Sequence, residues 1–342
     1  MKQMKLMITI LIVALIISGC GSSTVGGLGS TQTFERSAEA NIIVNSDSYP
    51  LTIIDYFGHE TVLDELPQRI AVLAGTPLNI WYDVGGKSIC SSDISDSNLK
   101  LIEEYREEML DLPVVGAVYS LDMEAVLAQK PDLVITQAGV QTSETKMLRD
   151  MNVPVVTTLT RSFEDVVDLY LAFGKILGHE ELAQEKVAKL VESRQAIIDK
   201  APAEGKSVVI LYLTASSLSV KLDNSIAGEI AQSLNIKNIA SDLPPDVIGS
   251  EHTPLDIEYI VEQNPDMVLV TSMIASNELA QSTMEQHFSS NQAWQSVPAV
   301  REGRVVYLPQ EYFLYNGGPY FAEAVYYMAA SVYPEIYGSI DE

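Results

Sequence analysis

The chain has 342 residues, of which 46 are acidic and 21 basic, so its formal net charge is -25. Nucleic acid is excluded as an expected partner, because phosphate binding requires a surface rich in Lys and Arg. The length suggests two domains of ordinary size, each able to bury its own core.

Residues 1–19 have the pattern of a lipoprotein signal peptide. Lys2 and Lys5 precede an apolar run over residues 6–17 that is too short to span a bilayer, and small residues then lead to Cys20. We expect cleavage before Cys20, whose lipid then anchors the protein to the extracytoplasmic face of the cell membrane. The alternative is an ordinary secretory signal followed by an accidental cysteine. Residues 20–49, rich in Gly, Ser, Thr and Asn, are predicted to form a flexible tether.

Once Cys20 carries lipid, only Cys90 remains in the mature chain. No intrachain disulfide and no Cys-based zinc site is then expected. Cys90 is predicted to be a small buried residue.

One segment of the chain occurs twice, because residues 121–135 recur in similar form as residues 255–269. In each copy an amphipathic stretch of helical length ends at a Pro-Asp pair, and a short apolar run follows. The residue before proline is pushed out of the helical region, so each copy predicts a helix, a turn and a buried parallel strand.

Short apolar runs alternate with helical segments around both copies. A first α/β lobe, residues 50–161, contains such runs at residues 70–74, 114–118 and 155–159. A second lobe, residues 204–342, contains them at residues 208–213, 267–271 and 305–308. Between them, residues 162–203 are rich in helix formers, and we predict one long rigid helix over residues 180–200. The fold class is therefore α/β, with two Rossmann-like lobes, a joining helix and a ligand cleft between the lobes.

Four motifs then occur in a specific order. They are Asp-Tyr-Phe-Gly-His at residues 55–59, Leu-Pro-Gln-Arg-Ile at 66–70, Lys-Pro-Asp at 130–132, and Trp294 with Ala-Val-Arg-Glu-Gly-Arg-Val-Val-Tyr at 299–307. With this order and spacing, residues 51–334 resemble the class III periplasmic binding proteins, the iron-siderophore, haem and vitamin B12 receptors of ABC importers. The chain departs from that family in residues 75–86, which lack the usual acidic residue of their helix and carry Trp81 and Tyr82 instead.

The resemblance implies an extracytoplasmic lipoprotein that captures a ferric siderophore or similar iron chelate and delivers it to the permease subunits of an ABC importer. It also implies that Glu124 and Glu258, which are equivalent in the repeat, lie on the rims of the lobes and pair with arginines of the permease. The alternative is that each glutamate only complements a helix N-terminus. We expect a monomer without a covalent cofactor.

The cleft is expected to be lined by loops that follow the strands of both lobes. The candidate ligand-binding residues are Tyr82, Ser92, Tyr119, Gln137, Arg161, Lys221, His252, Met273, Tyr312 and Tyr315. Tyrosines present a flat apolar body with a polar tip, which suits a bulky, partly polar ligand.

Cations are scarce in these loops. Only Arg161, Lys221 and Lys87 are placed to reach the cleft, which favours a ligand of low net charge. Arg161 has an alternative role, in which it caps helix-end carbonyls or pairs with Glu164. A ferric siderophore is the first choice of ligand, and haem or a corrinoid such as cobalamin (vitamin B12) is the alternative.

A bare metal ion is not the expected ligand, and no direct metal site is predicted. Such a site needs imidazoles that converge with carboxylates, and of the four histidines only His252 is expected in the cleft. We expect no enzyme, because the chain has no Gly-x-Ser-x-Gly elbow, no Gly-rich phosphate loop and no His-Glu-x-x-His motif. A chelate esterase and a surface adhesion module remain the alternatives of a different class.

Overall fold

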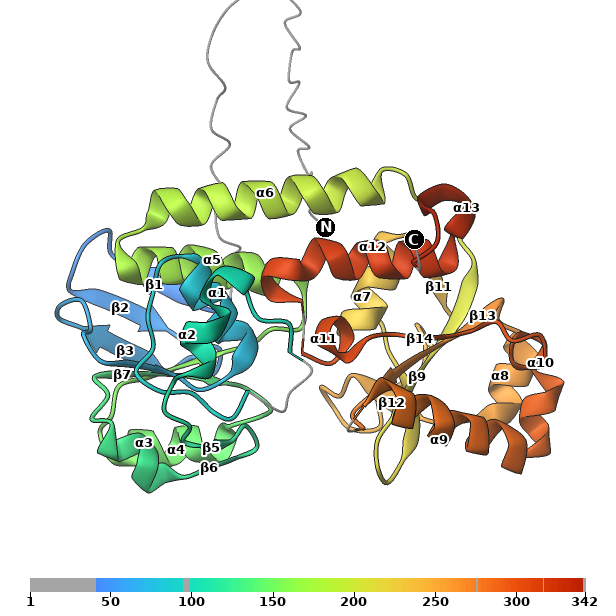
Figure 1. Cartoon of the computed structure of the whole chain (residues 1–342), viewed down its shortest axis with the longest axis horizontal. Helices are drawn as coiled ribbons and strands as arrows, with labels where there is room; N and C mark the ends of the chain where they lie inside the picture. The colour runs from blue at the N-terminus through green and yellow to red at the C-terminus, as the bar shows by residue number, and fades with distance from the viewer. Residues whose placement is uncertain (1–40, 95–98, 275, 316, 341–342) are drawn as a thin grey trace, which may run out of the picture. The chain divides into compact units, whose positions relative to one another are not determined.

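The structure is a computed structural model that describes residues 41–94, 99–274, 276–315 and 317–340. All of these residues belong to one folded unit, and Figure 1 labels most of its helices and strands. The signal peptide and Cys20 lie outside the described residues, so lipidation stays a prediction.

The described chain begins with a small antiparallel sheet. Its strands, in spatial order, are β1 (Ile43–Asn45), β2 (Leu51–Ile54) and β3 (Glu60–Leu63). The tether was predicted to extend to residue 49, and this boundary is wrong. Ile42 is completely buried, and the side chain of Asn41 donates a hydrogen bond of 3.0 Å to Asp165. The buried side chains of Ile42 and Val44 and the hydrogen bonds of Asn41 dock this stretch on the body.

The first lobe contains the predicted parallel sheet. Its strands, in spatial order, are β4 (Ile70–Val72), β7 (Leu133–Gln137) and β8 (Val155–Thr158). The strands are mostly apolar because both faces of the sheet are covered, and their polar residues, Thr136, Gln137, Thr157 and Thr158, lie at the carboxyl ends of β7 and β8. Helices α1 (Gly75–Asp83) and α5 (Phe163–Leu177) cover one face, and α3 (Met123–Ala128) and α4 (Thr142–Asp150) cover the other.

The apolar run over residues 114–118 is not a strand of this sheet. It forms an isolated bridge between Val114 and Ser91 and the short strand β5 (Gly116–Ala117), which pairs with β6 (Ser120–Leu121). Gly116 has a φ of 106°, which turns the chain into this hairpin and ends the extended run. The 3-10 helix η1 (Glu103–Tyr105) and helix α2 (Arg106–Leu110) precede it.

The second lobe contains a larger mixed sheet. Strands β9 (Ser207–Leu213), β13 (Met267–Ser272) and β14 (Val305–Tyr307) are parallel, as predicted. Three further strands extend the sheet. Strand β10 (Leu218–Lys221) is antiparallel to β9, and β12 (His252–Pro254) is antiparallel to β10. Strand β11 (Lys237–Asn238) is parallel to β9. Lys221 was expected in a cleft loop, but it is the last residue of strand β10, whose Val220 is buried in the core.

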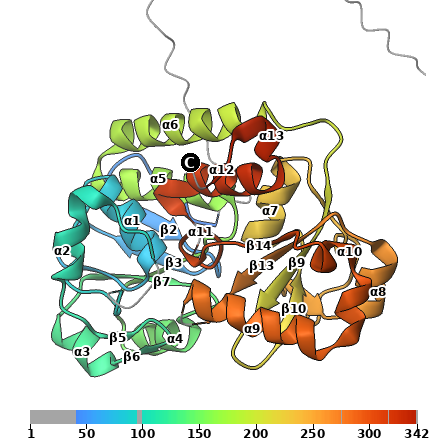
Figure 2. The same ribbon diagram turned by 45° about the vertical axis from the view of Figure 1, so that its right-hand side comes forward.

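Alternate residues of β9 face two different layers. Val208 and Ile210 pack with helices α7 (Ile226–Ser233) and α12 (Phe321–Val332). Val209 and Leu211 pack with α8 (Ile257–Gln263), α9 (Asn277–Ser290), α10 (Pro298–Arg301) and the 3-10 helix η2 (Gln292–Ser296). Figure 2 shows α7 above this sheet and α9 below it. The remaining elements are α11 (Gln310–Phe313), η3 (Gly318–Tyr320) and α13 (Pro334–Tyr337).

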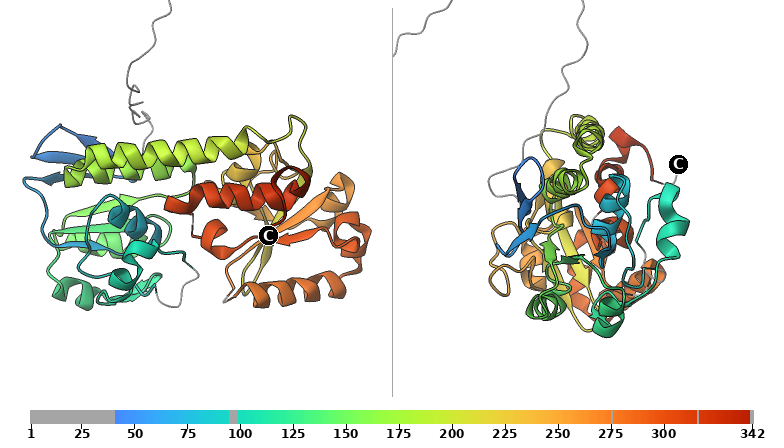
Figure 3. Two further views of the ribbon diagram at one scale, coloured as in Figure 1. Left: turned by 45° about the horizontal axis from the view of Figure 1, so that its top comes forward. Right: turned by 90° about the vertical axis from the view of Figure 1, so that its left-hand side faces the viewer.

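Two consecutive helices lead from the first lobe to the second. Helix α5 starts at a capping box made by Ser162 and Asp165 and ends at Gly178, which has the left-handed φ of 70° that glycine tolerates. The next helix, α6 (Glu180–Ile198), packs against both α5 and α12, as Figure 3 shows. The predicted long joining helix is therefore confirmed.

The two copies of the repeat have the same local structure. Asp122 caps α3 and Asp256 caps α8, and each carboxylate accepts two backbone N–H groups at 3.0 and 3.1 Å. Each helix is followed by a residue of positive φ, Lys130 and Asn264.

The aspartates of the two Pro-Asp pairs join neighbouring strands. Asp132 accepts the backbone N–H of Arg69 at 2.9 Å, at the start of β4. Asp266 accepts the backbone N–H of Ser207 at 2.8 Å, at the start of β9. The repeat thus fixes the start of β7 against β4 in the first lobe and the start of β13 against β9 in the second. This alignment also sets where the carboxyl ends of these strands lie.

Candidate ligand-binding site

Two cavities lie between the lobes and share part of their walls. Their volumes are about 390 Å³ and about 80 Å³, and we call them the larger and the smaller compartment of the cleft. Tyr119, Gln137 and Val140 of the first lobe and Leu314 of the second line both. The compartments adjoin the carboxyl ends of parallel strands, where open α/β sheets bind their ligands.

The charged centre of the larger compartment consists of Arg161, Lys221 and Glu251. Arg161 follows the last strand of the first lobe, whereas the other two residues belong to the second. The Glu251 carboxylate accepts from Arg161 Nε at 2.6 Å and from Lys221 Nζ at 3.1 Å. Arg161 therefore neither caps a helix end nor pairs with Glu164 as its main contact, and one carboxylate holds both cations of the cleft.

A second group in this compartment comes from β9, β10 and β12. Lys221 lies 4.2 Å from the centroid of the Tyr212 ring, and the backbone register places it opposite His252. His252 Nε2 lies 3.2 Å from Asp246, and Tyr212 donates to Met273 Sδ at 3.4 Å. Burial raises the pKa of Tyr212 to about 12, so its phenol stays neutral.

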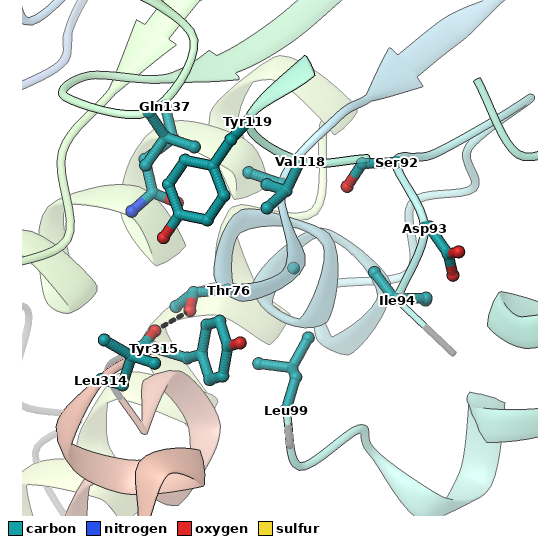
Figure 4. A pocket seen from close by; sticks show the side chains of 13 residues that line it. Thr76, Ser92, Asp93, Ile94, Leu99, Val118, Tyr119, Gln137, Leu314 and Tyr315 are labelled. Carbon is teal, nitrogen blue, oxygen red and sulfur yellow. Dashed lines mark hydrogen bonds between the residues drawn. The ribbon is translucent and has the colours of Figure 1, made fainter. Parts of the chain in front are cut away.

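The smaller compartment lies beside the start of α1. Figure 4 shows Thr76, Ser92, Tyr119, Gln137, Leu314 and Tyr315 around it. The Thr76 hydroxyl donates to the backbone carbonyl of Tyr315, so this contact joins the two lobes. Gln137 Nε2 donates to Thr160 at 3.0 Å.

Most of the candidate ligand residues line the two compartments. They are Ser92, Tyr119, Gln137, Arg161, Lys221, His252, Met273 and Tyr315. The structure thus brings them together around one cleft, whereas their contact with a ligand stays a prediction.

Tyr82 and Tyr312 line neither compartment, and this expectation is corrected. Tyr82 is only 1% exposed, because it lies on the face of α1 that packs into the core. Tyr312 packs towards α12, where its hydroxyl donates to Glu323 at 2.9 Å and accepts from Lys100 at 3.1 Å. Lys87 also lies outside the cleft, paired with Glu108.

Tyr212 is a cleft residue that sequence reasoning missed. It was part of an apolar run predicted as a buried strand, and its strand β9 is indeed buried on both faces. The available signal was a polar aromatic residue near the carboxyl end of that strand, where ligands of α/β sheets bind.

Glu124 and Glu258 occupy matching places in the first turns of α3 and α8, and both are exposed. Asp122 and Asp256 already cap the two helices. The glutamates are therefore not needed as caps and remain available to a partner.

Metal-binding groups do not cluster in the structure. Within the described ranges, no three His, Cys, Asp or Glu residues lie where they could hold a metal ion. His287, one of the three histidines not expected in the cleft, belongs to α9. Cys90 is completely buried, as expected.

Two α/β lobes with a joining helix and a cleft between them define a two-lobed solute-binding protein. The chain belongs to the periplasmic binding protein family, whose family model matches residues 70–312. It is therefore a substrate-binding protein, and the family is one of binding proteins rather than enzymes. The family resemblance found in the sequence is confirmed.

Curated relatives match most of the chain. The Fe(3+)-citrate-binding protein YfmC of Bacillus subtilis is 24% identical over 312 residues, which cover 89% of this chain and 88% of that protein. The ferric-anguibactin-binding protein FatB of Vibrio anguillarum is 22% identical over 264 residues, 75% of this chain and 79% of that protein.

Solved structures share the fold. S. aureus IsdE complexed with heme aligns with a TM-score of 0.67 at 18% identity, over 78% of this chain and 98% of that one. The vitamin B12-binding protein BtuF of Vibrio cholerae aligns with a TM-score of 0.62 at 19% identity, over 78% and 97%. Among the helices that the structure describes, none has both the length and the apolarity to cross a membrane.

Proposed function

We propose that the protein is the lipid-anchored, extracytoplasmic substrate-binding component of an ABC importer, and that its cleft binds a ferric chelate of low net charge. The proposal is supported by the family and by relatives whose names state that they bind ferric citrate and ferric anguibactin. It acts as a monomer in this account.

The sharing of Glu251 by Arg161 and Lys221 carries the proposal about ligand charge. Two cations and one carboxylate give the centre of the larger compartment a net charge of about +1 when all three are ionised. A highly anionic catecholate complex would need several unpaired cations. A chelate with about one negative charge matches the cleft better.

Iron enters this account inside a chelator rather than as a bare ion, because no three His, Cys, Asp or Glu residues of the described ranges lie where they could hold one. Burial raises the pKa values of Tyr119, Tyr212 and Tyr315, so these phenols are protonated in the free protein. Neutral phenols donate hydrogen bonds to the oxygens of a chelator and pack their rings against its body.

Haem or a corrinoid is the second candidate, because His252 and Met273 in the larger compartment are residue types that ligate haem iron. Both ring nitrogens of His252 already have neighbours, however. Nε2 lies 3.2 Å from Asp246 and Nδ1 lies 3.3 Å from the Ser250 hydroxyl. Ligation of haem would break one of these contacts, so the ferric chelate remains the first choice.

Delivery requires the cleft to face the permease while the chain stays at the membrane. We assign the first task to Glu124 and Glu258, one on each lobe, and the second to the lipid on Cys20. Replacing Cys20 by Ala should move the folded protein from the membrane to the soluble fraction, because the acyl chains supply the anchoring energy. Retention of that variant in washed membranes would argue against the lipid anchor.

Uptake of radioactive iron as a chelate tests the function in cells. A strain that lacks the protein should regain uptake with the wild type but not with a chain cut off after residue 161. Equal uptake with and without the protein, for ferric citrate, ferric hydroxamates and haem alike, would contradict the proposed function.

A further inference from the structure

We propose that the smaller compartment is a subsite for one free carboxylate arm of the chelate, held by the N-terminus of α1 and the hydroxyl of Ser92. This inference rests on the proposed function and adds the chemical class of the ligand. The body of the chelate then occupies the larger compartment.

The start of α1 is open towards the smaller compartment. Ala74 and Gly75 line it, and Ala74, as the N-cap residue, has no side chain that could bond to the first N–H groups. The first turn contains no acidic residue. The N-terminus of this nine-residue helix therefore keeps its partial positive charge, which favours an anionic group.

Ser92 supplies an independent observation. Its side chain is 1% exposed, yet its hydroxyl has no hydrogen-bond partner among the described residues. In Figure 4 this hydroxyl points towards the compartment. A buried hydroxyl without a partner lowers stability, so a ligand oxygen that reaches Ser92 gains a hydrogen bond without displacing an existing one.

The other walls fit a single small anion. The raised pKa values of Tyr119 and Tyr315 keep their phenols as neutral donors. Asp93 also lines the compartment, but its carboxylate points away from Thr76 and Tyr119 in Figure 4. No Lys or Arg is present among the lining residues that the structure describes, which argues against a multiply charged group such as phosphate.

Size separates the two compartments. The smaller has a volume of about 80 Å³ against about 390 Å³ for the larger, so only a short arm enters it. Because both share Tyr119, Gln137, Val140 and Leu314 as walls, one molecule can occupy both at once.

Ser92→Ala tests the subsite, and Ser91→Ala is its matched control. Ser91 is in the same loop, is also 1% exposed and also has an unpaired hydroxyl, but it does not line the compartment. The probes are ferric citrate, which has carboxylates beyond those that hold iron, and a ferric trihydroxamate without carboxylates. Affinities are measured by calorimetric titration, and the thermal stability of each free variant is measured beside them.

We expect Ser92→Ala to weaken ferric citrate binding about tenfold, the loss of one hydrogen bond to a charged group. The affinity of Ser92→Ala for the trihydroxamate should equal that of the wild type. Ser91→Ala should bind both probes with wild-type affinity. Neither variant should melt at a lower temperature, because neither serine hydroxyl has a hydrogen bond to the described part of the chain.

Each other result overturns the subsite. The inference is contradicted, while the proposed function stands, if Ser92→Ala binds ferric citrate with wild-type affinity or loses affinity equally for both probes. It is also contradicted if Ser91→Ala loses as much affinity as Ser92→Ala, or if the wild type binds only the trihydroxamate. A wild type that binds neither probe, nor haem or cobalamin, overturns both together.

Discussion

At the scale of single residues, the charge of the cleft depends on Glu251. Its carboxylate is the counter-ion of Arg161 and Lys221, and it reaches Arg161 from the opposite lobe. A ligand anion that approaches these cations therefore competes with a carboxylate that is already in place. This internal competition sets how negative a bound chelate can be.

Glu251→Gln should raise the affinity for an anionic ferric chelate by about tenfold, because one added positive charge near the ligand is worth about 1 kcal/mol or more in partly screened surroundings. The affinity for neutral ligands should not rise. Glu302→Gln is the control, since Glu302 also lies between two arginines, Arg301 and Arg304, but outside the cleft. Calorimetric titrations at low and high salt check this, and an unchanged affinity of Glu251→Gln would contradict the role of Glu251.

Two tyrosines provide a matched pair of substitutions. Tyr82→Ala should lower stability by about 3 to 5 kcal/mol, because it removes a fully buried ring, and should leave the affinity of the remaining folded protein intact. Tyr119→Ala should weaken ligand binding and leave stability nearly unchanged, since Tyr119 is 52% exposed on the cleft wall. Urea unfolding and ligand titration of both variants separate the two roles. Weaker binding by folded Tyr82→Ala would show that this tyrosine affects the cleft after all.

The sequence located most of the cleft because the ends of parallel strands mark it, as with Gln137 and Arg161. It could not place Tyr82, because α1 is buried nearly all round and has no polar face to show which side is the cleft. Tyr312 was misplaced for a related reason. Its orientation depends on Lys100 and Glu323, which are far from it in the sequence.

At the scale of elements, Glu229 joins three helices at the junction of the lobes. It belongs to α7, accepts the backbone N–H of Phe163 at the start of α5 at 3.0 Å, and lies 3.6 Å from Arg194 of α6. Burial, and secondarily the charge of Glu164, raise the pKa of Glu229 to about 7. This junction is therefore sensitive to pH.

The sign of this effect follows from proton binding. Because the pKa of Glu229 is higher in the folded state, the folded protein binds more protons than the unfolded chain between about pH 4.5 and pH 7. Its contribution to stability is complete below this window and is lost as the pH rises through it. The loss is about 3 kcal/mol at most.

Glu229→Gln should remove this pH dependence. The difference in free energy of unfolding, wild type minus variant, should fall as the pH is raised from about 5 to about 8. Urea unfolding at several pH values measures it, with the exposed Glu181→Gln as control. A difference that stays constant with pH would contradict the raised pKa.

Elements with a strong local signal were predictable from the sequence, whereas those that depend on distant contacts were not. The repeat and α6 were found because Pro-Asp pairs and long runs of helix formers act locally. Strand β10 is short and has polar residues at alternate positions, so it was taken for a loop. Strand β1 owes its place to Val44 and to docking on α5. The turn at Gly116 required a positive φ that the apolar run did not reveal.

At the scale of the whole molecule, each lobe has an equivalent helix start at its surface. Asp122 and Asp256 cap these helices, and Glu124 and Glu258 are exposed beside them. A partner that contacts both lobes at once can sense whether the cleft is closed. Under the proposed function, this property would let an importer distinguish loaded from empty protein.

Glu124→Arg combined with Glu258→Arg should abolish uptake and leave ligand affinity unchanged. Each substitution replaces an attraction by like-charge repulsion, which costs several kcal/mol at an interface. Glu180→Arg with Glu181→Arg is the control, since these residues are also exposed first-turn acids but belong to the joining helix α6. Iron uptake by cells and titration of the purified variants measure the two effects, and a parallel loss of affinity would refute the assignment to the rims.

The central claim is that the cleft between the lobes binds one iron chelate. Calorimetric titration of the protein with a panel of ferric citrate, ferric hydroxamates, haem and cobalamin tests it most directly. The account predicts one saturable site per chain for a ferric chelate, with a dissociation constant of about 1 μM or lower. It also predicts no comparable binding of ferric ion alone. Absence of saturable binding to every member of the panel at micromolar protein would contradict the account.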